Sequence, residues 1–492
     1  MSAYGAARAT TPAAAALAGE GVLYENAFAV STWTRPSVAT VLTSLLPAET
    51  STLNRYGVLD ESVPYLPSLF QKAGWKTAAF VGNRNIFDRR IGFRRGFDTF
   101  LAVAGVGENL HPRARQVVDP AVAFIDRQTS PHFFLYVHVM DPHLPYLIEA
   151  EAERQFSLPD DGRAFDPREQ LLLRYDRSIR QADDGFQRIA AAVRRKSWWR
   201  KATVVYTADH GEEFFEHAGQ GHGRTLHEEQ IRVPLIVKWP GMLDAGQRRA
   251  GPVSLADIVP TFAQLAGLPG SSRWIGRSLR TADDFERDIY LSESLDNVRS
   301  FGLRKASGKL ILQLYPKFKQ VRYDLAQDPG EQVGQELECG DGPAPDEPLF
   351  RSFRQWNARD LAATPSVLVE KRDPKPYSLD LLVNLKGSKP FLRAEDYCAL
   401  CSVQEGTSLA IRRDLPAAEP FSLRLSADDR GQLPIVRLNV SSPGAIAPVA
   451  LGTASAPFLI TRTTARLLTG PNTDELFRHM RALGYLAGGD HD

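Results

Sequence analysis

Two kinds of segment alternate along the first two thirds of the chain. Helical patterns, including a long one over 168–195, separate apolar runs that are rich in β-branched and aromatic residues. These runs are KTAAFVG (76–82), HFFLYVHVM (132–140), ATVVYTAD (202–209) and VPLIVKW (233–239). Near-continuous apolar runs predict strands that are buried on both faces of a mainly parallel sheet. The alternation therefore predicts an α/β domain over residues 1–335, in which ligands bind where strands end and loops begin.

The pattern changes after residue 335. Residues 336–376 are rich in Pro, Gly and charged side chains, which is typical of a linker. Residues 377–466 contain short alternating runs such as FSLRLSA, PIVRLNVSS and APFLITRT, which predict a small antiparallel β domain. Apolar residues return at helical spacing in TDELFRHMRALGYLAGG, so we expect a C-terminal helix and tail over 467–492.

Composition restricts the class of partner. The chain has 492 residues, of which 43% are hydrophobic, and its 59 basic and 58 acidic residues leave a formal charge of +1. No overall field therefore attracts nucleic acid, and no nucleic-acid-binding motif accompanies the local basic clusters. No apolar run reaches the roughly 18 residues of a membrane span, and the first 21 residues predict a Thr-capped helix begun by Pro12, not a leader. Localisation and oligomeric state are not indicated by the chain.

Cysteine usage adds little to this picture. The three cysteines, Cys339, Cys398 and Cys401, form no disulfide framework for a chain of this length. One CxxC pair without a second cysteine pair or nearby paired histidines is a weak zinc signal. We therefore interpret this pair as a surface turn.

The stretch STWTRPSVATVLTS, residues 31–44, places Thr34 two residues ahead of a proline and an apolar helical pattern. One interpretation is an N-cap, in which the Thr34 hydroxyl satisfies a free backbone N–H and Pro36 lies in the first turn. The other is a nucleophile at a helix N-terminus, whose N–H groups and dipole would bind an anionic substrate group. The local sequence leaves both open.

Histidines gather after two of the predicted strands. Six of the ten histidines fall in the segments HVMDPHLPY and TADHGEEFFEHAGQGHGRTLHEEQ. They are His138, His143, His210, His217, His222 and His227, and Asp209 directly precedes one of them. Carboxylate and imidazole groups at the carboxyl ends of buried strands are suited to divalent cations and anions. The sequence therefore predicts a metal or anion site there.

Five segments, in order along the chain, carry a family resemblance. STWTRPSVATVLTSLLP, HVMDPHLPY, TADHGEEFFEHAGQGHGRTLHEEQIRVPLIV, SLADIVPTFAQLAGLPG and YDLAQDPGEQ resemble the sulfatase family of the alkaline phosphatase superfamily. The closing MRALGYL resembles the terminal helix of bacterial members, whereas 377–466 has no counterpart. The resemblance implies a three-layer α/β sandwich with a mainly parallel central sheet. A smaller β-rich segment and a terminal helix would follow it.

The resemblance also implies roles for individual residues. Thr34 matches the nucleophile position, which in sulfatases is a Cys or Ser converted to formylglycine; threonine cannot be converted, so no formylglycine is expected. In related phosphotransferases an unmodified Thr forms a phosphothreonine intermediate. Val38 stands where sulfatases usually have an arginine. The remaining correspondences are Asp209 and His210 as metal ligands, His222 and His143 as catalytic groups, and His138 and Arg35 as substrate-binding groups.

The implied function is a metal-dependent hydrolase of a small anionic sulfate or phosphate ester. The divalent ion would be Ca²⁺, Mg²⁺, Mn²⁺ or Zn²⁺. A phosphotransferase acting on lipid or glycan headgroups is the alternative enzyme. The family's site also uses an Asp pair at the end of the first central strand, a segment that would precede Met1, so we expect the working protein to be longer. If Met1 is the true start, an inactive anion-binding protein is the expectation.

Overall fold

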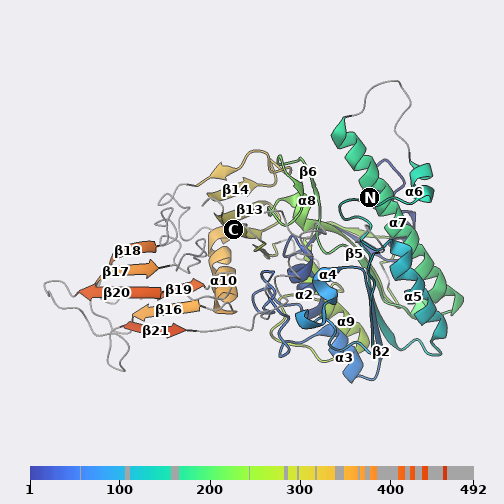
Figure 1. Ribbon diagram of the computed structural model, residues 1–492, viewed down its shortest axis with the longest axis horizontal. Helices are drawn as coiled ribbons and strands as arrows, with labels where there is room; N and C mark the ends of the chain where they lie inside the picture. The colour runs from blue at the N-terminus through green and yellow to red at the C-terminus, as the bar shows by residue number, and fades with distance from the viewer. Residues whose placement is uncertain are drawn as a thin grey trace. The chain divides into compact units, whose positions relative to one another are not determined.

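The computed structural model describes most of the chain as two compact units (Figure 1). The first comprises Met1–Leu45 and Leu59–Arg287, and the second comprises Leu46–Val58 and the described part of Asp288–Thr469. The described residues are 1–55, 57–105, 111–156, 166–242, 244–281, 286–295, 298–315, 319–337, 348–363, 366–371, 377–384, 408–415, 422–426, 435–441 and 458–462. The predicted terminal helix at 467–492 and the three cysteines lie outside these ranges.

Two sheets form the middle of the first unit. One is parallel, in the order β3-β2-β4, and the other is mixed, in the order β10-β1-β8-β5 with β9 also paired to β1. Their strands are β1 (Val22–Phe28), β2 (Lys76–Val81), β3 (Thr99–Ala102), β4 (Phe133–His138), β5 (Val204–Thr207), β8 (Arg232–Lys238), β9 (Arg248–Arg249) and β10 (Val253–Ser254). The four predicted strands are all present, but β8 runs antiparallel to both of its neighbours, β1 and β5.

Helices cover both faces of these sheets and make three layers. Consecutive residues of β1, such as Leu23 and Tyr24, point into different hydrophobic clusters, because successive side chains of a strand lie on opposite faces of the sheet. One cluster contains residues of α1 (Pro12–Glu20), α5 (Ala114–Arg127) and α7 (Pro167–Arg195). The other contains residues of α2 (Thr34–Thr43), α3 (Leu66–Lys72) and α9 (Ile258–Ala266). The predicted α/β three-layer sandwich is confirmed, including the long helix expected over 168–195.

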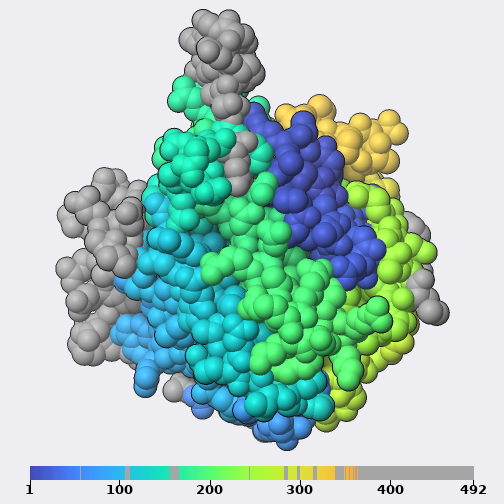
Figure 2. Space-filling view, turned by 90° about the vertical axis from the view of Figure 1, so that its right-hand side faces the viewer, coloured from blue at the N-terminus to red at the C-terminus, as the bar shows by residue number. Residues whose placement is uncertain are grey.

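Short elements complete the first unit. They are α4 (Arg84–Phe87), α6 (Ala150–Gln155), α8 (Glu228–Ile231), a hairpin of β6 (Glu213–Phe214) and β7 (Gln220–Gly221), and single 3₁₀ turns at Ser2–Tyr4, Arg89–Ile91, Trp199–Lys201 and Leu255–Asp257. Figure 2 shows the N-terminal segment, in blue, lying on the surface beside the green part of the chain. An ion pair of 2.5 Å between Arg8 and Asp176 of α7 joins these segments, so the N-terminal residues are part of the packed unit.

The second unit is antiparallel β structure with one helix. A five-stranded sheet in the order β11-β12-β13-β14-β15 is followed by two three-stranded sheets, β19-β16-β21 and β18-β17-β20. The strands are β11 (Ile289–Glu293), β12 (Arg299–Arg304), β13 (Gly308–Tyr315), β14 (Lys319–Asp324), β15 (Gln335–Glu336), β16 (Ser366–Lys371), β17 (Tyr377–Asn384), β18 (Ser408–Leu415), β19 (Ser422–Ser426), β20 (Ile435–Ser441) and β21 (Phe458–Arg462). The antiparallel strands expected within 377–466 are therefore present.

The compact units differ from the boundaries expected from composition. The stretch 336–376, interpreted as a linker, contains α10 (Pro348–Ala363) and β16. Apolar residues of α10, among them Leu349 and Phe353, are buried, and a helix that buries one face gains stability that local composition does not reveal. No helix among the described residues is long and apolar enough to cross a membrane.

Candidate functional site

Thr34 begins α2 and is almost completely buried, at 1% exposure. The N-cap residue is Trp33, and the cap makes no side-chain hydrogen bond, so the capping interpretation of Thr34 is wrong. Its Oγ1 instead accepts a hydrogen bond of 3.0 Å from Nδ2 of Asn83. The hydroxyl is thus held by a tertiary contact at a helix N-terminus, where the backbone dipole favours negative charge.

Asn83 was not predicted to belong to the site. It lies two residues after the end of β2, and its side-chain oxygen caps α4 by accepting from the Asn85 amide at 2.9 Å. The amide nitrogen is therefore oriented toward Thr34 while the oxygen is occupied elsewhere. The sequence feature that could have identified Asn83 is its position after a buried parallel strand, the same feature that indicated the histidines.

His138 lies at the end of β4, beside Asn83. Its Nε2 is 3.5 Å from Nδ2 of Asn83, and its Nδ1 is 2.9 Å from the Tyr136 hydroxyl. Burial lowers the pKa of His138, although the Asp209 carboxylate acts in the opposite direction. A neutral imidazole is therefore fixed next to the asparagine that holds Thr34.

Asp209 and His210 follow β5, as predicted. The Ser37 hydroxyl of α2 donates to the Asp209 carbonyl, which joins this loop to the helix that carries Thr34. His210 donates from Nδ1 to the Gly211 carbonyl at 2.9 Å, and this leaves its Nε2 at 3.6 Å from Oδ2 of Asp209. Burial alone would raise the pKa of Asp209, but the neighbouring His210, His138 and His222 hold it below its usual range.

This pair fits part of a cation site. Oδ2 of Asp209 is buried and accepts no hydrogen bond from the described residues, and an imidazole nitrogen faces it. Burial also lowers the pKa of His210, which keeps the ring neutral, the form that binds metals. A carboxylate and a neutral imidazole are two of the ligands that a divalent ion needs, so a complete site requires ligands besides Asp209 and His210.

His222 and His143 extend the same cluster. The His222 ring lies 4.1 Å from that of His210 and 5.0 Å from that of His143, centroid to centroid. Nδ1 of His222 is 3.1 Å from the buried Glu212 carboxylate. Burial, His222 and His111 together lower the pKa of His143 well below its ordinary value. His111, whose ring is 5.0 Å from that of His143, was also missed, because no strand pattern precedes it.

Arg35 is fully buried and connects two helices. Its Nε donates to the Asn85 carbonyl at 3.2 Å, and its guanidinium lies 5.7 Å from the Trp33 ring. Burial lowers its pKa to about 9. These contacts tie the start of α2 to α4, and a substrate contact for Arg35 stays a prediction.

The structure therefore brings the predicted residues together in two groups. Thr34, His138, Asp209, His210, His222 and His143 are connected by direct contacts or by single intervening side chains. His217 and His227, from the same glycine-rich loop, do not join them and instead contact Glu229. The first group combines a hydroxyl, a carboxylate and several neutral imidazoles, which is suitable for nucleophilic attack on an anionic ester.

Comparison with known protein families gives two overlapping matches. The family described as Sulfatase matches residues 1–268, and the one described as N-sulphoglucosamine sulphohydrolase, C-terminal, matches residues 216–336. The first match covers more than half of the chain and contains every residue of the site.

Curated proteins with similar sequences carry sulfatase names. Steryl-sulfatase of Mus musculus is 31% identical over 193 residues, which are 36% of this chain and 29% of that protein. Arylsulfatase K of Xenopus laevis is 24% identical over 317 residues, 53% and 59% of the two chains. N-acetylgalactosamine-6-sulfatase of Sus scrofa is 27% identical over 334 residues, 55% and 60% of the two. The matched part thus spans less than two thirds of each relative.

Solved structures show the same fold. A phosphonate monoester hydrolase of Agrobacterium radiobacter is 18% identical with a TM-score of 0.58, covering 74% of this chain and 92% of that one. A protein in complex with its substrate D-glucosamine-2-N,6-O-disulfate is 19% identical with a TM-score of 0.60, covering 74% and 94%. At these identities the likeness concerns the fold.

Proposed function

The chain belongs to the sulfatase family, and from this premise we propose that it is a metal-dependent hydrolase of small sulfate or phosphate esters with Thr34 as the nucleophile. The observation that carries the proposal is the 3.0 Å hydrogen bond from Asn83 to Oγ1 of Thr34 at the start of α2. A buried hydroxyl that serves only as a helix cap would bond to its own helix, whereas this one is oriented by the side chain of Asn83, the N-cap residue of α4.

Asp209 and His210 would hold the divalent ion. When bound, such an ion polarises an ester oxygen and lowers the effective pKa of a hydroxyl beside it. Two ligands are too few for Ca²⁺ or Mg²⁺, which take six or more oxygen ligands, some of them from water. Among the described residues, β4 pairs only with β2 and β5 pairs only with β8, so each has one edge without a partner strand. We propose that a further strand, placed along these edges, supplies the missing carboxylates.

The side chains then divide the reaction between them. Oγ1 of Thr34 loses its proton to water and forms a bond to the sulfur or phosphorus. The ester oxygen leaves with its bonding electrons, and His143 or His222 gives that oxygen a proton. Both rings belong to a histidine cluster that carries little positive charge without a bound ester, because burial keeps His143, His210 and His138 neutral. A bound anionic ester would raise these pKa values and supply the acid at the moment it is needed. Water then displaces Thr34 from the covalent intermediate.

Thr34 also supports a second enzyme reaction. A threonine hydroxyl, unlike a formylglycine, forms a stable phosphate ester, and an acceptor alcohol could replace water in the second step. The alternative is therefore a phosphotransferase acting on a lipid or glycan headgroup. A non-catalytic anion-binding protein remains the competing class if no further metal ligands join Asp209 and His210.

Turnover of chromogenic sulfate and phosphate esters tests these proposals. Thr34→Ala should abolish turnover and Thr34→Ser should retain part of it, whereas Thr99→Ala on the exposed start of β3 should match the wild type. Acid-quenched wild-type protein should carry the sulfuryl or phosphoryl group on the peptide that contains Thr34. Full turnover by Thr34→Ala would remove Thr34 from the mechanism. Absence of turnover in every form, with retained binding of sulfate or phosphate, would favour the binding protein.

A further inference from the structure

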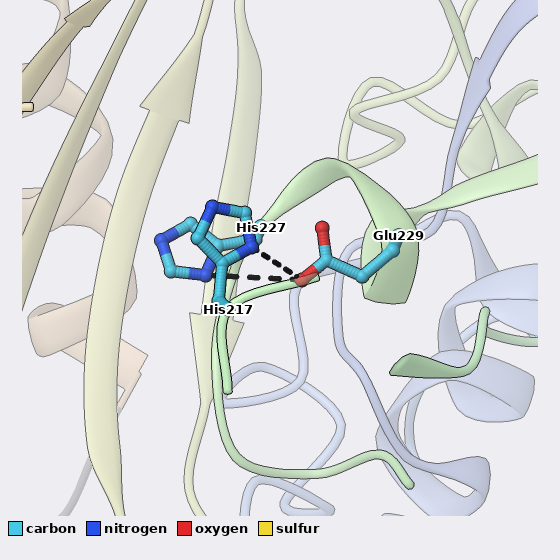
Figure 3. A group of neighbouring side chains, drawn as sticks. All are labelled: His217, His227 and Glu229. Carbon is cyan, nitrogen blue, oxygen red and sulfur yellow. Dashed lines mark hydrogen bonds and ion pairs between the residues drawn. The ribbon is translucent and has the colours of Figure 1, made fainter. Parts of the chain in front are cut away.

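Three side chains converge at the end of the glycine-rich loop, outside the site described above. Figure 3 shows the rings of His217 and His227 side by side, facing the carboxylate of Glu229. The ring centroids are 3.7 Å apart, and the rings are inclined by only 19°. Nδ1 of His217 is 2.8 Å from Oε1 of Glu229, and Nδ1 of His227 is 4.0 Å from the same oxygen. One imidazole is hydrogen-bonded to this carboxylate oxygen, and the second imidazole nitrogen lies close to it.

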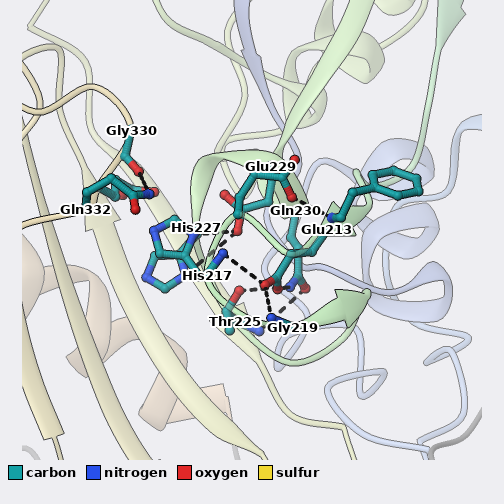
Figure 4. A network of polar contacts seen from close by, with 12 residues as sticks. Glu213, His217, Gly219, Thr225, His227, Glu229, Gln230, Gly330 and Gln332 are labelled. Carbon is teal, nitrogen blue, oxygen red and sulfur yellow. Dashed lines mark hydrogen bonds and ion pairs between the residues drawn. The ribbon is translucent and has the colours of Figure 1, made fainter. Parts of the chain in front are cut away.

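The loop that carries these residues is held by a buried carboxylate. Glu213, which is 1% exposed, accepts hydrogen bonds from the backbone amides of His217 at 3.2 Å and Gly219 at 2.6 Å (Figure 4). Its other oxygen accepts from the amide of Gln230 at 2.8 Å, and this buried amide also donates to Thr225 at 2.9 Å. Both ends of the loop are thus fixed to one anchor, which is how proteins position metal ligands before the ion binds.

Two adjacent glutamates bind to different clusters, one to the catalytic group and the other to the loop of His217. Glu212 is bonded to His222, whereas the next residue, Glu213, braces the loop of His217. Glu212 directly precedes β6 and Glu213 begins it, and their carboxylates bind different groups. The ring contacts are also separate, because the His222 ring lies against His210, whereas the His217 ring stacks on His227.

The donor atoms suit a borderline divalent cation. The nearest ligand atoms of the three residues lie within 4.8 Å of one another. Ligand atoms around one Zn²⁺ are up to about 4 Å apart, so a small side-chain rotation brings all three into range. Each side chain is 14 or 15% exposed, which leaves a path for an ion and for water as a further ligand.

We propose that His217, His227 and Glu229 form a second metal site, which binds Zn²⁺ or a similar cation and cross-links the loop to the start of α8. Two imidazole nitrogens and one carboxylate oxygen form an N₂O donor set of the kind that selects zinc over calcium or magnesium. Its role is structural, because it closes the loop that carries His222. The inference depends on the fold and not on the proposed hydrolysis.

Zinc binding to the full chain tests this inference. Bound zinc per chain is measured by equilibrium dialysis with excess Mg²⁺, for the wild type and for His227→Ala and Glu229→Gln, each also in an Asp209→Asn background. We expect both substitutions to remove one zinc equivalent, or to weaken its binding on the order of 100-fold or more, in either background. His132→Ala, at an exposed histidine elsewhere, should bind as the wild type does.

A second readout identifies the ligands. Co²⁺ in place of zinc should give visible bands that Glu229→Gln alters, and far-UV circular dichroism should show that the variants are folded. Glu229→Gln is nearly isosteric, so it decides the matter alone if His227→Ala unfolds. No zinc on the wild type, wild-type affinity in Glu229→Gln, or a loss caused only by Asp209→Asn would each overturn the inference.

Discussion

Asp183 of α7 caps a helix that begins about 170 residues earlier in the chain. Its two carboxylate oxygens accept from the Ala13 amide at 2.7 Å and the Ala14 amide at 2.9 Å, at the first turn of α1. Thr11 is the N-cap residue of α1 but makes no side-chain cap hydrogen bond. Asp183→Ala therefore removes the side-chain acceptors of both amides, and no local side chain replaces them.

The cost can be estimated from these contacts. Loss of an N-cap interaction costs about 1 kcal/mol, and a buried donor left without a partner costs about 1–3 kcal/mol. Asp183 and Ala14 are both buried, so we expect Asp183→Ala to destabilise α1 by about 2–4 kcal/mol. Asp183→Asn keeps one acceptor oxygen and should lose about half of that.

Native-state hydrogen exchange of the peptide covering residues 10–20 measures this loss locally. A loss of about 2 kcal/mol corresponds to roughly 30-fold faster exchange of the Ala13 and Ala14 amides. The matched control is Asp184→Ala, the next residue of α7, whose partly exposed ion pair with Arg180 should contribute under about 0.5 kcal/mol. Equal exchange rates in Asp183→Ala and Asp184→Ala would show that Asp183 does not cap α1.

Three further predictions concern single polar contacts. Asn83→Ser should keep the α4 cap but lose the hydrogen bond to Thr34. We therefore expect kcat/KM to fall about 10-fold or more while the melting temperature stays unchanged. Unchanged kinetics would contradict the positioning role of Asn83. Arg287→Met should cost about 3–5 kcal/mol in urea unfolding, because it leaves the fully buried Asp257 carboxylate without its partner, and a loss below 1 kcal/mol would refute this. Burial raises the pKa of Asp141 to about 6, so its protonated form stabilises the fold below pH 4 and this contribution is lost as the pH rises through 6. Asp141→Asn should therefore gain up to about 3 kcal/mol on the wild type between pH 4 and pH 8, and parallel pH profiles of the two proteins would argue against it.

Much of the candidate site could be predicted, because its residues follow strands that are easily recognised. His138, Asp209 and His210 directly follow or end apolar runs, and loops at the carboxyl ends of such strands converge in α/β folds. Asn83 follows the same kind of run but was not selected, since an amide carries no charge and binds metals less often than His or Asp. The pairing of His217 with His227 was equally hidden, because it depends on how the loop between β6 and α8 turns.

The sequence by itself determined the main strands and the long helix of the first unit. The apolar runs of β2, β4, β5 and β8 and the amphipathic pattern of α7 are local properties, and each element formed within two residues of its predicted bounds. Tertiary structure decided the direction of β8, the capping of α1 by Asp183 and the bond from Asn83 to Thr34. Periodicity reports only which face of an element is apolar, whereas these contacts join residues 49 or more positions apart and depend on how the elements pack.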